Sequence, residues 1–437
     1  MISYAASLAN IAAAGLEFAP DAPGTSSLEQ RHFDGLETQA PEQREELLLA
    51  RLPLLVRSAK VAKGWAWLLS GIDARSVTTR QALAKLPVLR RHDIAGMQAG
   101  APPFGGLVAE RPAAFKRLFP SAGGVYQAEA AATDAWRAAR ALFAAGIRSE
   151  NVVLNCLPYH LATSGFIVDS GCRALGCPVI PAGPGDLDER LDVIEHLAPL
   201  AYAGTADFLL QLADRARETG RDIASLRLAF IPEGGLDDAT RARLAERGIA
   251  ASAALTSPEL GVLAFETGGH DGFVVNEDLL VEIVHPGTGE PVAEGEVGEV
   301  VVTAFDPHRP LIRLATGQLS AVRPGASSEG HTNTRLAGWL GTARQSSRIG
   351  DVEVTAAQMA ELRRRHPGLG RVRLTLSREG DRDEAHLAAE VERLDADFAA
   401  ALAQTLRAVA RVEGRVELVS GRRLPNDGRV IVDTRAG

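Results

Sequence analysis

Residues 152–160 read VVLNCLPYH, a short apolar run that ends in polar and turn-forming residues. Three more runs of this kind follow along the chain: CPVIPAG (177–183), AYAGT (201–205) and LRLAFIP (226–232). Helical patterns lie between them, for example ADFLLQLADRARETG at 206–220. Strands that alternate with helices predict an α/β fold with a parallel sheet. Because ligands of such sheets bind where the strands end, the loops after these runs are candidate site loops.

The rest of the chain divides into regions of different pattern. Up to about residue 100 the text is mostly helical, whereas residues 271–325 are rich in strand patterns, with HPGTGEP and EGEVGE predicted as turns between antiparallel strands. A small α+β unit follows, with helical patterns at 356–366 and 395–412, strand patterns at 371–379 and 386–392, and a final strand at 430–432. We therefore expect an N-terminal extension at 1–27, a large domain at 28–340 and a small C-terminal domain at 341–437.

The amino-acid composition limits the class of protein to which the chain can belong. A chain of 437 residues exceeds one ordinary core, and 46% hydrophobic with 23% charged residues describes a globular protein. The net charge of −8, mixed along the length, argues against a nucleic-acid partner. Three cysteines (Cys156, Cys172 and Cys177) form no even disulfide framework, which fits a reducing compartment. No apolar run approaches ~20 residues and the start lacks a basic signal region, so we expect a cytoplasmic protein without a membrane partner.

Two local motifs have both a functional and an ordinary interpretation. PSAGGVYQ (120–127) is a glycine-containing loop before a predicted helix and could present N–H groups to an anion, although a plain turn is the better interpretation of the motif taken alone. Tyr159 and His160 follow a predicted strand, yet a lone histidine is more often a structural hydrogen-bonding residue than a catalyst. Cys172 and Cys177 have no partner pair at zinc spacing and are interpreted as buried small side chains.

Taken together, these segments resemble the phenylacetate–CoA ligase branch of the adenylate-forming superfamily. The resemblance runs from about residue 30 to the end and is carried by these stretches: HFDGLETQAPEQRE (32–45), RQALAKLPVLRRHDI (80–94), EIVHPGTGEPVAEGEVGEVVVTAFDPHRPLIRLATGQL (282–319) and LPNDGRVIVDTR (424–435). The 282–319 stretch is the most specific, and 424–435 is similar to the C-terminal lysine loop of the family.

The resemblance implies a large N-terminal adenylate-forming domain and a small mobile C-terminal lid. Members of the family activate a carboxylic acid, often aromatic, with ATP and Mg²⁺ to an acyl-adenylate, and then transfer the acyl group to coenzyme A. Positive charge must meet the phosphate and the developing oxyanion in such reactions. Family members often form dimers, so a homodimer is expected by analogy.

Several residues at the expected catalytic positions differ from those of the family. The lysine position of the lid loop holds Arg429, which keeps the charge but is longer and planar. The ribose-binding aspartate is replaced by Gln318, which lacks charge assistance, whereas Arg313 does match. At the hinge, Thr342 and Arg344 stand where the family has glycine-arginine and aspartate.

The phosphate loop and the magnesium-binding acid are also altered. The loop is reduced to Ser121, Gly123 and Gly124 with Ala122 between them, and the adenine-side residues match Glu233 and Gly234 in reversed order. Glu259 is the best match for the magnesium-binding acid in one register; a second register keeps Thr256 and places Ser257 at the acid. Both registers remain open.

Three functions follow from these residues. A ligase would use Arg429 as lid cation, with an acyl pocket drawn from Tyr159, Phe166, Tyr202 and Gly204. An ATP-independent enzyme on the same scaffold would handle an acyl thioester, with Tyr159 and His160 as acid–base candidates. A non-catalytic homologue would keep the pocket for binding only. We favour the ligase, and nucleotide affinity separates it from the other two.

Overall fold

The computed structural model describes residues 31–121, 123–232, 236–306, 308–380 and 382–435. The expected extension at 1–27 lies outside these residues. Within the described part of the chain, no helix has both the length and the apolar character needed to cross a bilayer. The predicted α/β class is confirmed, because a nine-stranded mixed sheet is accompanied by helices and by smaller sheets.

The helices begin and end where local side chains favour it. Thr205 caps one of them through its hydroxyl, which accepts the N–H of Phe208, and Gly220 ends the same helix in the left-handed region. The α-helices of the described residues are α2 (Pro41–Ala59), α3 (Lys63–Leu68), α4 (Arg80–Ala84), α5 (Arg91–Gly100), α6 (Ala138–Ala144), α7 (Ser164–Leu175), α8 (Leu187–Leu197), α9 (Ala206–Thr219), α10 (Asp238–Ala245), α11 (Ala356–Arg365) and α12 (Ala396–Ala410), with short 3₁₀ helices at Gly35–Thr38, Ala74–Ser76 and Pro112–Ala114.

The main sheet contains the four runs predicted from sequence. In spatial order its strands are β13 (Val322–Arg323), β14 (Arg335–Leu336), β9 (Phe273–Val275), β8 (Gly261–Glu266), β7 (Ala250–Ser257), β6 (Leu228–Pro232), β5 (Ala201–Ala203), β3 (Val153–Asn155) and β4 (Val179–Pro181). The β7-β6-β5-β3-β4 half is parallel and the remainder antiparallel. The alternation of short apolar runs with helices therefore predicted four of the five parallel strands correctly, and β7 was missed.

The two faces of this sheet carry different helices. α6 and α7 contribute to a core on one face, together with Ala201 and Ala203 of β5. α8, α9 and α10 contribute to the core that contains Tyr202. Because successive strand residues point to opposite faces, neighbours in β5 belong to different cores. The face of a residue consequently decides which site it can reach.

A second, antiparallel sheet packs against the N-terminal helices. Its order is β10 (Leu279–Val284), β11 (Gly298–Ala304), β12 (Leu311–Ser320) and β15 (Gly341–Thr342). HPGTGEP and EGEVGE both lie in the connection between β10 and β11, which are antiparallel as predicted. Leu52 and Trp65 share a core with Val300 and Ile312, so burial of apolar side chains joins the helices to this sheet.

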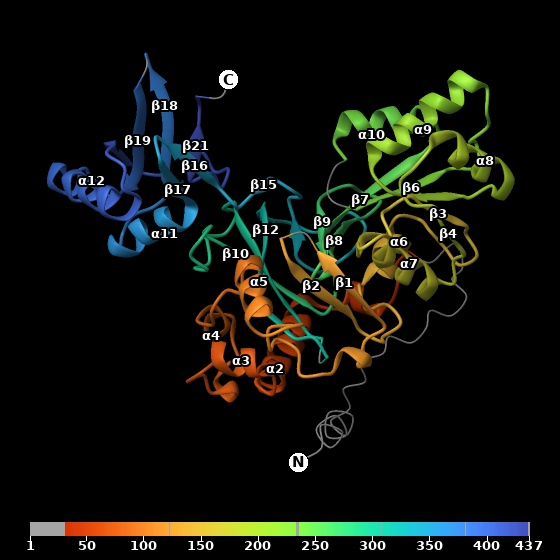
Figure 1. The fold of residues 1–437 in the computed structure, drawn as a ribbon, viewed down its shortest axis with the longest axis horizontal. Helices are drawn as coiled ribbons and strands as arrows, with labels where there is room; N and C mark the ends of the chain where they lie inside the picture. Colours follow the sequence, from red (N-terminus) through yellow and green to blue (C-terminus); the bar gives the residue numbers. More distant parts are fainter. Residues whose placement is uncertain (1–30, 122, 233–235, 307, 381, 436–437) are drawn as a thin grey trace.

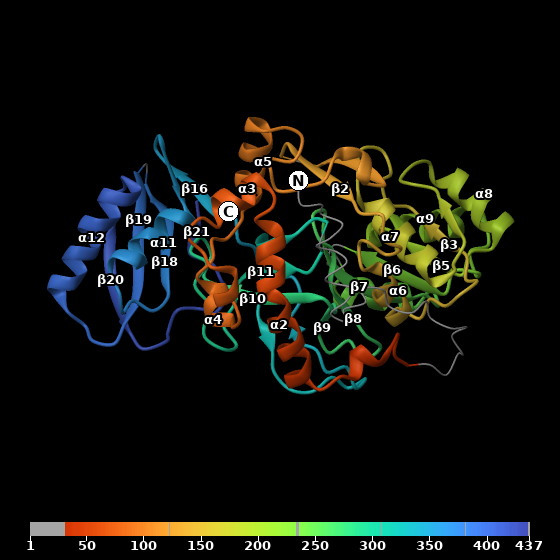
Figure 2. The same ribbon diagram turned by 90° about the horizontal axis from the view of Figure 1, so that it is seen from below.

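The C-terminal residues form their own core. The strands are β16 (Ser346–Ile349), β17 (Val352–Thr355), β18 (Val372–Glu379), β19 (Arg382–Val391), β20 (Arg415–Ser420) and β21 (Ile431–Asp433). β20 was missed from sequence, whereas the two helices and the other strands past β17 were expected. The buried members of this core all come from Val354 to Ile431. Figures 1 and 2 place this unit at one end of the molecule and α8 to α10 at the other. The boundary at 340/341 stays a prediction.

The stretch PSAGGVYQ does not precede a helix directly, and that prediction was wrong. It forms the turn of a hairpin between β1 (Arg117–Ser121) and β2 (Val125–Glu129), with Ser121 paired to Val125. Gly123 and Gly124 have φ of 77° and 75°, a region that favours glycine and permits the tight turn. Glycine was a correct turn signal here, but the flanking apolar residues belong to a strand pair.

Candidate active site

Ser121 and Glu259 are brought together by Arg91, the first residue of α5. The Arg91 Nη2 donates to the Ser121 hydroxyl and lies 3.4 Å from Glu259 Oε1. The sequence analysis missed Arg91. A signal existed, because Arg90 and Arg91 begin a helix where the macrodipole favours acidic side chains, so each requires a carboxylate partner. Arg90 has one in Glu299, at 2.9 Å.

Glu259 is a buried carboxylate with one engaged oxygen. The Ser257 hydroxyl donates to Oε2 over 2.7 Å, and the Glu259 N–H donates to Ser257 Oγ over 3.2 Å. Oε1 is buried without a hydrogen bond to any described residue. The structure therefore brings the Glu259 carboxylate to Arg91 and Ser121, and Ser257 serves as its hydrogen-bonding partner.

Gln318 contacts both the end of β7 and Thr342 of the predicted hinge. Its Nε2 donates to the carbonyl of Thr256 over 2.9 Å, and its Cα pairs with that of Thr342 across β12 and β15. The Thr342 hydroxyl donates to Gly317 O over 3.3 Å and accepts the N–H of Arg344. Gln318 Oε1 is buried and has no hydrogen-bond partner among the described residues. The predicted ribose and hinge residues are thus direct neighbours.

Arg313 is not part of this group. It is 1% exposed, and all five of its N–H donors are engaged. Glu282 accepts two of them at 2.9 and 3.0 Å, and the carbonyls of Ala84, Leu86 and Gly289 accept the others. In this arrangement Arg313 ties the N-terminal helices to β10 and has no donor left for a nucleotide. Glu233 and Gly234 lie outside the described residues.

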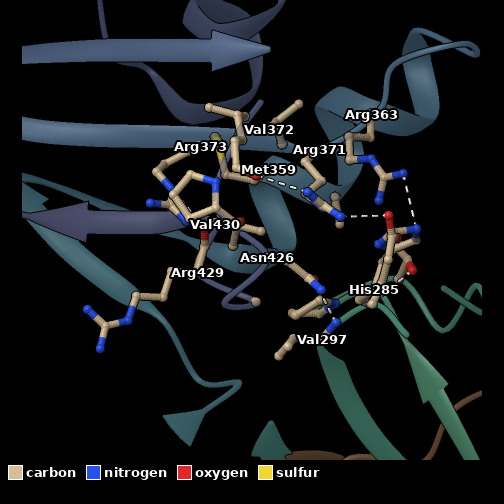
Figure 3. A pocket seen from close by; sticks show the side chains of 17 residues that line it. His285, Val297, Met359, Arg363, Arg371, Val372, Arg373, Asn426, Arg429 and Val430 are labelled. Atoms are coloured by element: carbon tan, nitrogen blue, oxygen red, sulfur yellow. Dashed lines mark hydrogen bonds and ion pairs between the residues drawn. The ribbon is translucent and has the colours of Figure 1, made fainter. Parts of the chain in front are cut away.

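The lid loop holds Arg429 by its backbone and leaves its side chain exposed. The Arg429 N–H donates to Asp427 Oδ1 over 2.9 Å, and its carbonyl accepts from Arg373 Nε over 3.3 Å. The guanidinium has no hydrogen bond or ion pair with the described residues, and Figure 3 shows it extended away from the other labelled side chains. Arg429 is therefore a cation that remains available.

Two amide side chains fix the loop around Arg429. Asn426 Nδ2 donates to Gly295 O over 2.9 Å, and Asn426 Oδ1 accepts the Val297 N–H over 2.8 Å. Gln345 donates to Gly428 O over 2.8 Å and accepts from the N–H groups of Val430 and Ile431 at 2.7 and 3.1 Å. The loop is consequently anchored both to the β10–β11 connection and to the segment after the hinge.

A small cavity lies between this loop and the β10–β11 connection (Figure 3). Its volume is about 40 Å³, room for a few waters at roughly 10–15 Å³ each and too little for a nucleotide. Arg371 joins its two sides by an ion pair with Glu296 at 2.9 Å. His285, 3.3 Å from Arg363 Nη2, has a pKa lowered to about 4, first by burial and then by the charges of Arg363 and Arg371.

Of the predicted acyl-pocket residues, Tyr159 and Phe166 meet. Their rings are edge to face with centroids 5.0 Å apart, and Phe119, which the sequence analysis missed, stacks near Phe166 at 5.2 Å. The Tyr159 hydroxyl accepts from Asn155 Nδ2 over 2.8 Å, and burial raises its pKa above the usual tyrosine range. His160 is exposed. Tyr159 therefore stays protonated near neutral pH.

Tyr202 and Gly204 are separated from this aromatic pair. Tyr202 is fully buried in the core under α8 to α10, and its hydroxyl donates to Thr205 O over 2.9 Å. A Cβ at Gly204 would lie 2.2 Å from that hydroxyl, so Gly204 makes room for Tyr202. Phe166 packs on the core of the opposite face. The structure thus gives Tyr202 and Gly204 a packing role on the other side of the sheet.

The described residues contain no group of three or more His, Cys, Asp or Glu side chains arranged to hold a metal ion. A divalent ion at Glu259 would therefore take most of its ligands from elsewhere. Mg²⁺ commonly binds in this way, through one or two carboxylates together with substrate phosphates and waters. The buried Oε1 of Glu259, which accepts no hydrogen bond from a described residue although Arg91 lies 3.4 Å away, fits such an ion.

Known proteins resemble this chain in sequence and in fold. No family model matches the chain. A phenylacetate-coenzyme A ligase of Thermus thermophilus is 30% identical over 262 residues, which is 58% of this chain and 59% of that protein. The Pseudomonas putida enzyme of the same name is 31% identical over 43% and 45% of the two chains, and the Escherichia coli one 29% over 46% and 48%. The chain thus matches about half the length of these relatives.

A solved structure extends the comparison to almost the whole chain. A 2-hydroxyisobutyryl-CoA ligase, in an open conformation with 2-HIB-AMP and CoA, superposes with a TM-score of 0.69. The superposition covers 95% of this chain and 98% of that one at 21% identity. The fold is therefore that of an adenylate-forming CoA ligase, and the predicted resemblance to phenylacetate–CoA ligases is confirmed. The ATP-independent and non-catalytic alternatives are not favoured.

Proposed function

From this relationship to the phenylacetate–CoA ligases of the adenylate-forming superfamily, we propose that the protein is an AMP-forming acid–CoA ligase acting on an aromatic acid. A carboxylate oxygen of the acid attacks the α-phosphorus of ATP, and the bond to pyrophosphate breaks. The thiolate of coenzyme A then attacks the acyl carbon, and AMP leaves. Both steps need positive charge near phosphate or carbonyl oxygens.

One observation carries this proposal: Arg91 links Ser121 of the β1–β2 turn to Glu259 after β7. A hydroxyl, a guanidinium and a carboxylate from three distant parts of the sequence meet there. A phosphate chain with its divalent ion needs this combination of donors and acidic ligand. Their meeting supports nucleotide binding despite the shortened phosphate loop.

We assign roles to these residues as follows. Ser121 and Arg91 donate to phosphate oxygens, and Glu259 would hold Mg²⁺ through Oε1. When bound, the ion neutralises negative charge on the phosphates. Gln318 accepts from a ribose hydroxyl through its unpartnered Oε1. Because this acceptor is uncharged, the hydrogen bond is weaker than one to a carboxylate.

Residues 341–437 act in this proposal as a lid that turns about Thr342 and Arg344. The exposed guanidinium of Arg429 is the group that the lid delivers to the reacting carboxylate and phosphate. The Arg429 guanidinium has no side-chain partner among the described residues to give up. The turn of the lid breaks instead the hydrogen bonds of Asn426 and the ion pair of Arg371 to the β10–β11 connection. Tyr159 is not used as a base, since its raised pKa keeps it protonated.

Calorimetric titration with ATP, with and without Mg²⁺, and then with AMP tests the proposal first. We expect ATP to bind in a Mg²⁺-dependent manner. A screen for pyrophosphate release over aromatic acids, with and without coenzyme A, then identifies the substrate. A well-folded protein that binds neither nucleotide contradicts the proposal.

Two finer properties belong with this proposal. We infer a homodimer and a cytoplasmic location by analogy with the enzymes that the chain resembles. Light scattering on the purified full chain measures the first, and fractionation of the producing cells measures the second. A monomer at micromolar concentration would contradict the dimer.

A further inference from the structure

Arg309 is a buried cation with unsatisfied donors. Its side chain is 6% exposed, and its Nε and Nη1 have no hydrogen-bond partner among the described residues. The carboxylate oxygen Asp306 Oδ2 is 3.9 Å from Nε, too far for a hydrogen bond. Asp306 Oδ1 instead accepts the backbone N–H groups of His308 and Arg309, at 2.9 and 3.2 Å. Buried donors of a charged group are costly to leave unpaired, so this side chain requires an acceptor.

Further unpaired donors lie beside Arg309. Its Cζ is 4.8 Å from the ring centre of Trp136, whose Nε1 is buried and has no hydrogen-bond partner in the described part of the chain. Trp136 is next to Phe119, with ring centres 6.5 Å apart, and Phe119 is paired across the hairpin with Gln127. Gln127 Nε2 is a further buried donor without a partner. Native proteins leave few such groups unsatisfied. Among the described residues, Arg309 and Trp136 are in contact, and Gln127 is linked to Trp136 through Phe119.

An aromatic wall continues from these donors. The rings of Phe119 and Phe166 are tilted by 44° with centres 5.2 Å apart, and Phe166 meets Tyr159 edge to face at 5.0 Å. Arg117 Cζ lies 4.6 Å from the centre of the Phe166 ring and covers part of it. Phe166 and Tyr159 are only partly buried, so the wall reaches the surface at that end. Flat apolar rings next to N–H donors form the kind of surface that holds a ring bearing an anionic group.

The neighbouring carboxylates do not neutralise Arg309. Glu129 is fully buried, but Arg117 Nη1 holds it at 2.9 Å and Lys116 lies 3.7 Å away. Glu259 is held by Ser257 and Arg91. Burial lowers the pKa of Arg309, and Arg137 adds to this effect, whereas Asp306, Glu259 and Glu129 oppose it. Asp306 is within ion-pair distance at 3.9 Å but accepts no hydrogen bond from the Arg309 side chain, so the Nε and Nη1 donors are left for a ligand.

We propose that Arg309, with the Trp136 Nε1 and Gln127 Nε2 donors, recognises the carboxylate of an aromatic acid whose ring packs on Phe119 and Phe166. The guanidinium fork matches the two oxygens of a carboxylate. This inference rests on the proposed ligase function and identifies the residue that selects the acid before activation. Arg309 is a specificity-determining contact within the 282–319 stretch, where the family resemblance assigned roles to Arg313 and Gln318 but none to Arg309.

Calorimetric titration without nucleotide tests this contact directly. Benzoate, phenylacetate and 4-hydroxybenzoate are the probes, with phenylacetamide as the uncharged analogue. We expect the wild-type protein to bind at least one acid. The affinity for the amide should be about 30-fold lower than for the acid, as loss of a charged hydrogen bond predicts. Arg309→Met should weaken acid binding by a similar factor, and Arg309→Lys by less, because it keeps the charge without the fork.

Arg148→Met is the matched control. Arg148 also lies over a buried ring, with Cζ 3.6 Å from the centre of Phe143, but its Nη1 donates to the carbonyls of Phe143 and Ile147, at and just past the end of α6. It should leave acid affinity unchanged. If Arg309→Met does not fold, Arg309→Lys and the acid–amide pair on the wild-type protein decide the question.

Several outcomes overturn the inference. The first is that phenylacetate and phenylacetamide bind with equal affinity, and the second is that no acid binds. The third is that Arg309 variants lower the affinity for ATP while the affinity for the acid stays unchanged. Failure of the ligase proposal has a different signature. In that case acid binding still depends on Arg309, but no acid in the panel supports pyrophosphate release.

Discussion

The lid loop at 426–430 and the group formed by Arg91, Ser121 and Glu259 use arginine in opposite ways. In the lid loop the backbone is fixed by Asn426 and Gln345, and the Arg429 guanidinium is free. In the large part the Arg91 guanidinium is itself bonded to Ser121 and close to Glu259. The hydrogen-bonded guanidinium of Arg91 suits continuous contact with a phosphate. The guanidinium of Arg429, which has no partner among the described residues, suits contact with the substrate during a single step of the reaction. Variants of the two groups should therefore differ in the size of their effects.

Glu259→Gln should cause the largest loss. It removes the only assigned acidic ligand and the partner of Arg91, so pyrophosphate release should fall by roughly 100-fold or more, as expected for a group that organises charge at a phosphate. Pyrophosphate release at saturating Mg²⁺ measures this. Glu266→Gln is the matched control, because Glu266 also pairs with an arginine, Arg241 at 2.7 Å, outside the assigned site. Similar losses in both variants would mean that the effect is structural.

Arg429→Ala should act on one half-reaction. Adenylate formation should fall by about 30- to 100-fold, because one positioned cation is lost from the transition state, while acyl transfer from preformed adenylate changes by only a few fold. Rapid-quench measurements of the two steps separate these effects. Arg429→Lys should raise adenylate formation if only the shape of the cation is suboptimal. Arg423→Ala, an exposed arginine just before the same loop, should change neither step.

Asn426→Ala should loosen the lid loop without removing a charge. Two hydrogen bonds to the β10–β11 connection are lost, worth about 1–2 kcal/mol together, or roughly 5- to 30-fold in an opening equilibrium. Hydrogen exchange of the Val297 amide, which donates to Asn426 Oδ1, reports this opening. Asn426→Asp keeps that acceptor and loses the bond to Gly295, so its exchange should be intermediate. Unchanged protection in both variants would show that the amide does not anchor the loop.

His285 should make stability depend on pH by a smaller amount. Its folded pKa of about 4 is below the usual value of 6.5, so on acidification the unfolded chain takes up the proton first. Stability is therefore present above about pH 6.5 and is lost as pH falls towards 4, by on the order of 1–2 kcal/mol for a partly buried group. Urea unfolding at pH 7 and 4.5 measures the loss, which His285→Gln should reduce. His92→Gln, at an exposed position, should leave it unchanged.

The parts of the fold with strong local patterns were predictable. The apolar runs that became β3 to β6 end in turn residues, and α11 starts with a Thr355–Gln358 capping box. β20 was missed because its burial pattern has no fully buried position, so it shows little contrast between two faces. The glycine turn after Ser121 was recognised, but a hairpin and a helix-preceding loop share that signal.

The sequence by itself determined the α/β class, the resemblance to phenylacetate–CoA ligases, and the candidate residues Ser121, Glu259 and Gln318. Only the tertiary structure decided what those residues and their neighbours touch. Arg313 and Arg309 lie four positions apart, yet the first has every donor engaged and the second retains two without partners. Tyr202 and Phe166 looked equivalent as aromatic candidates, but they lie on opposite faces of one sheet. Local sequence fixes periodicity and turns, whereas contacts between distant segments depend on how the elements pack, which no short stretch encodes.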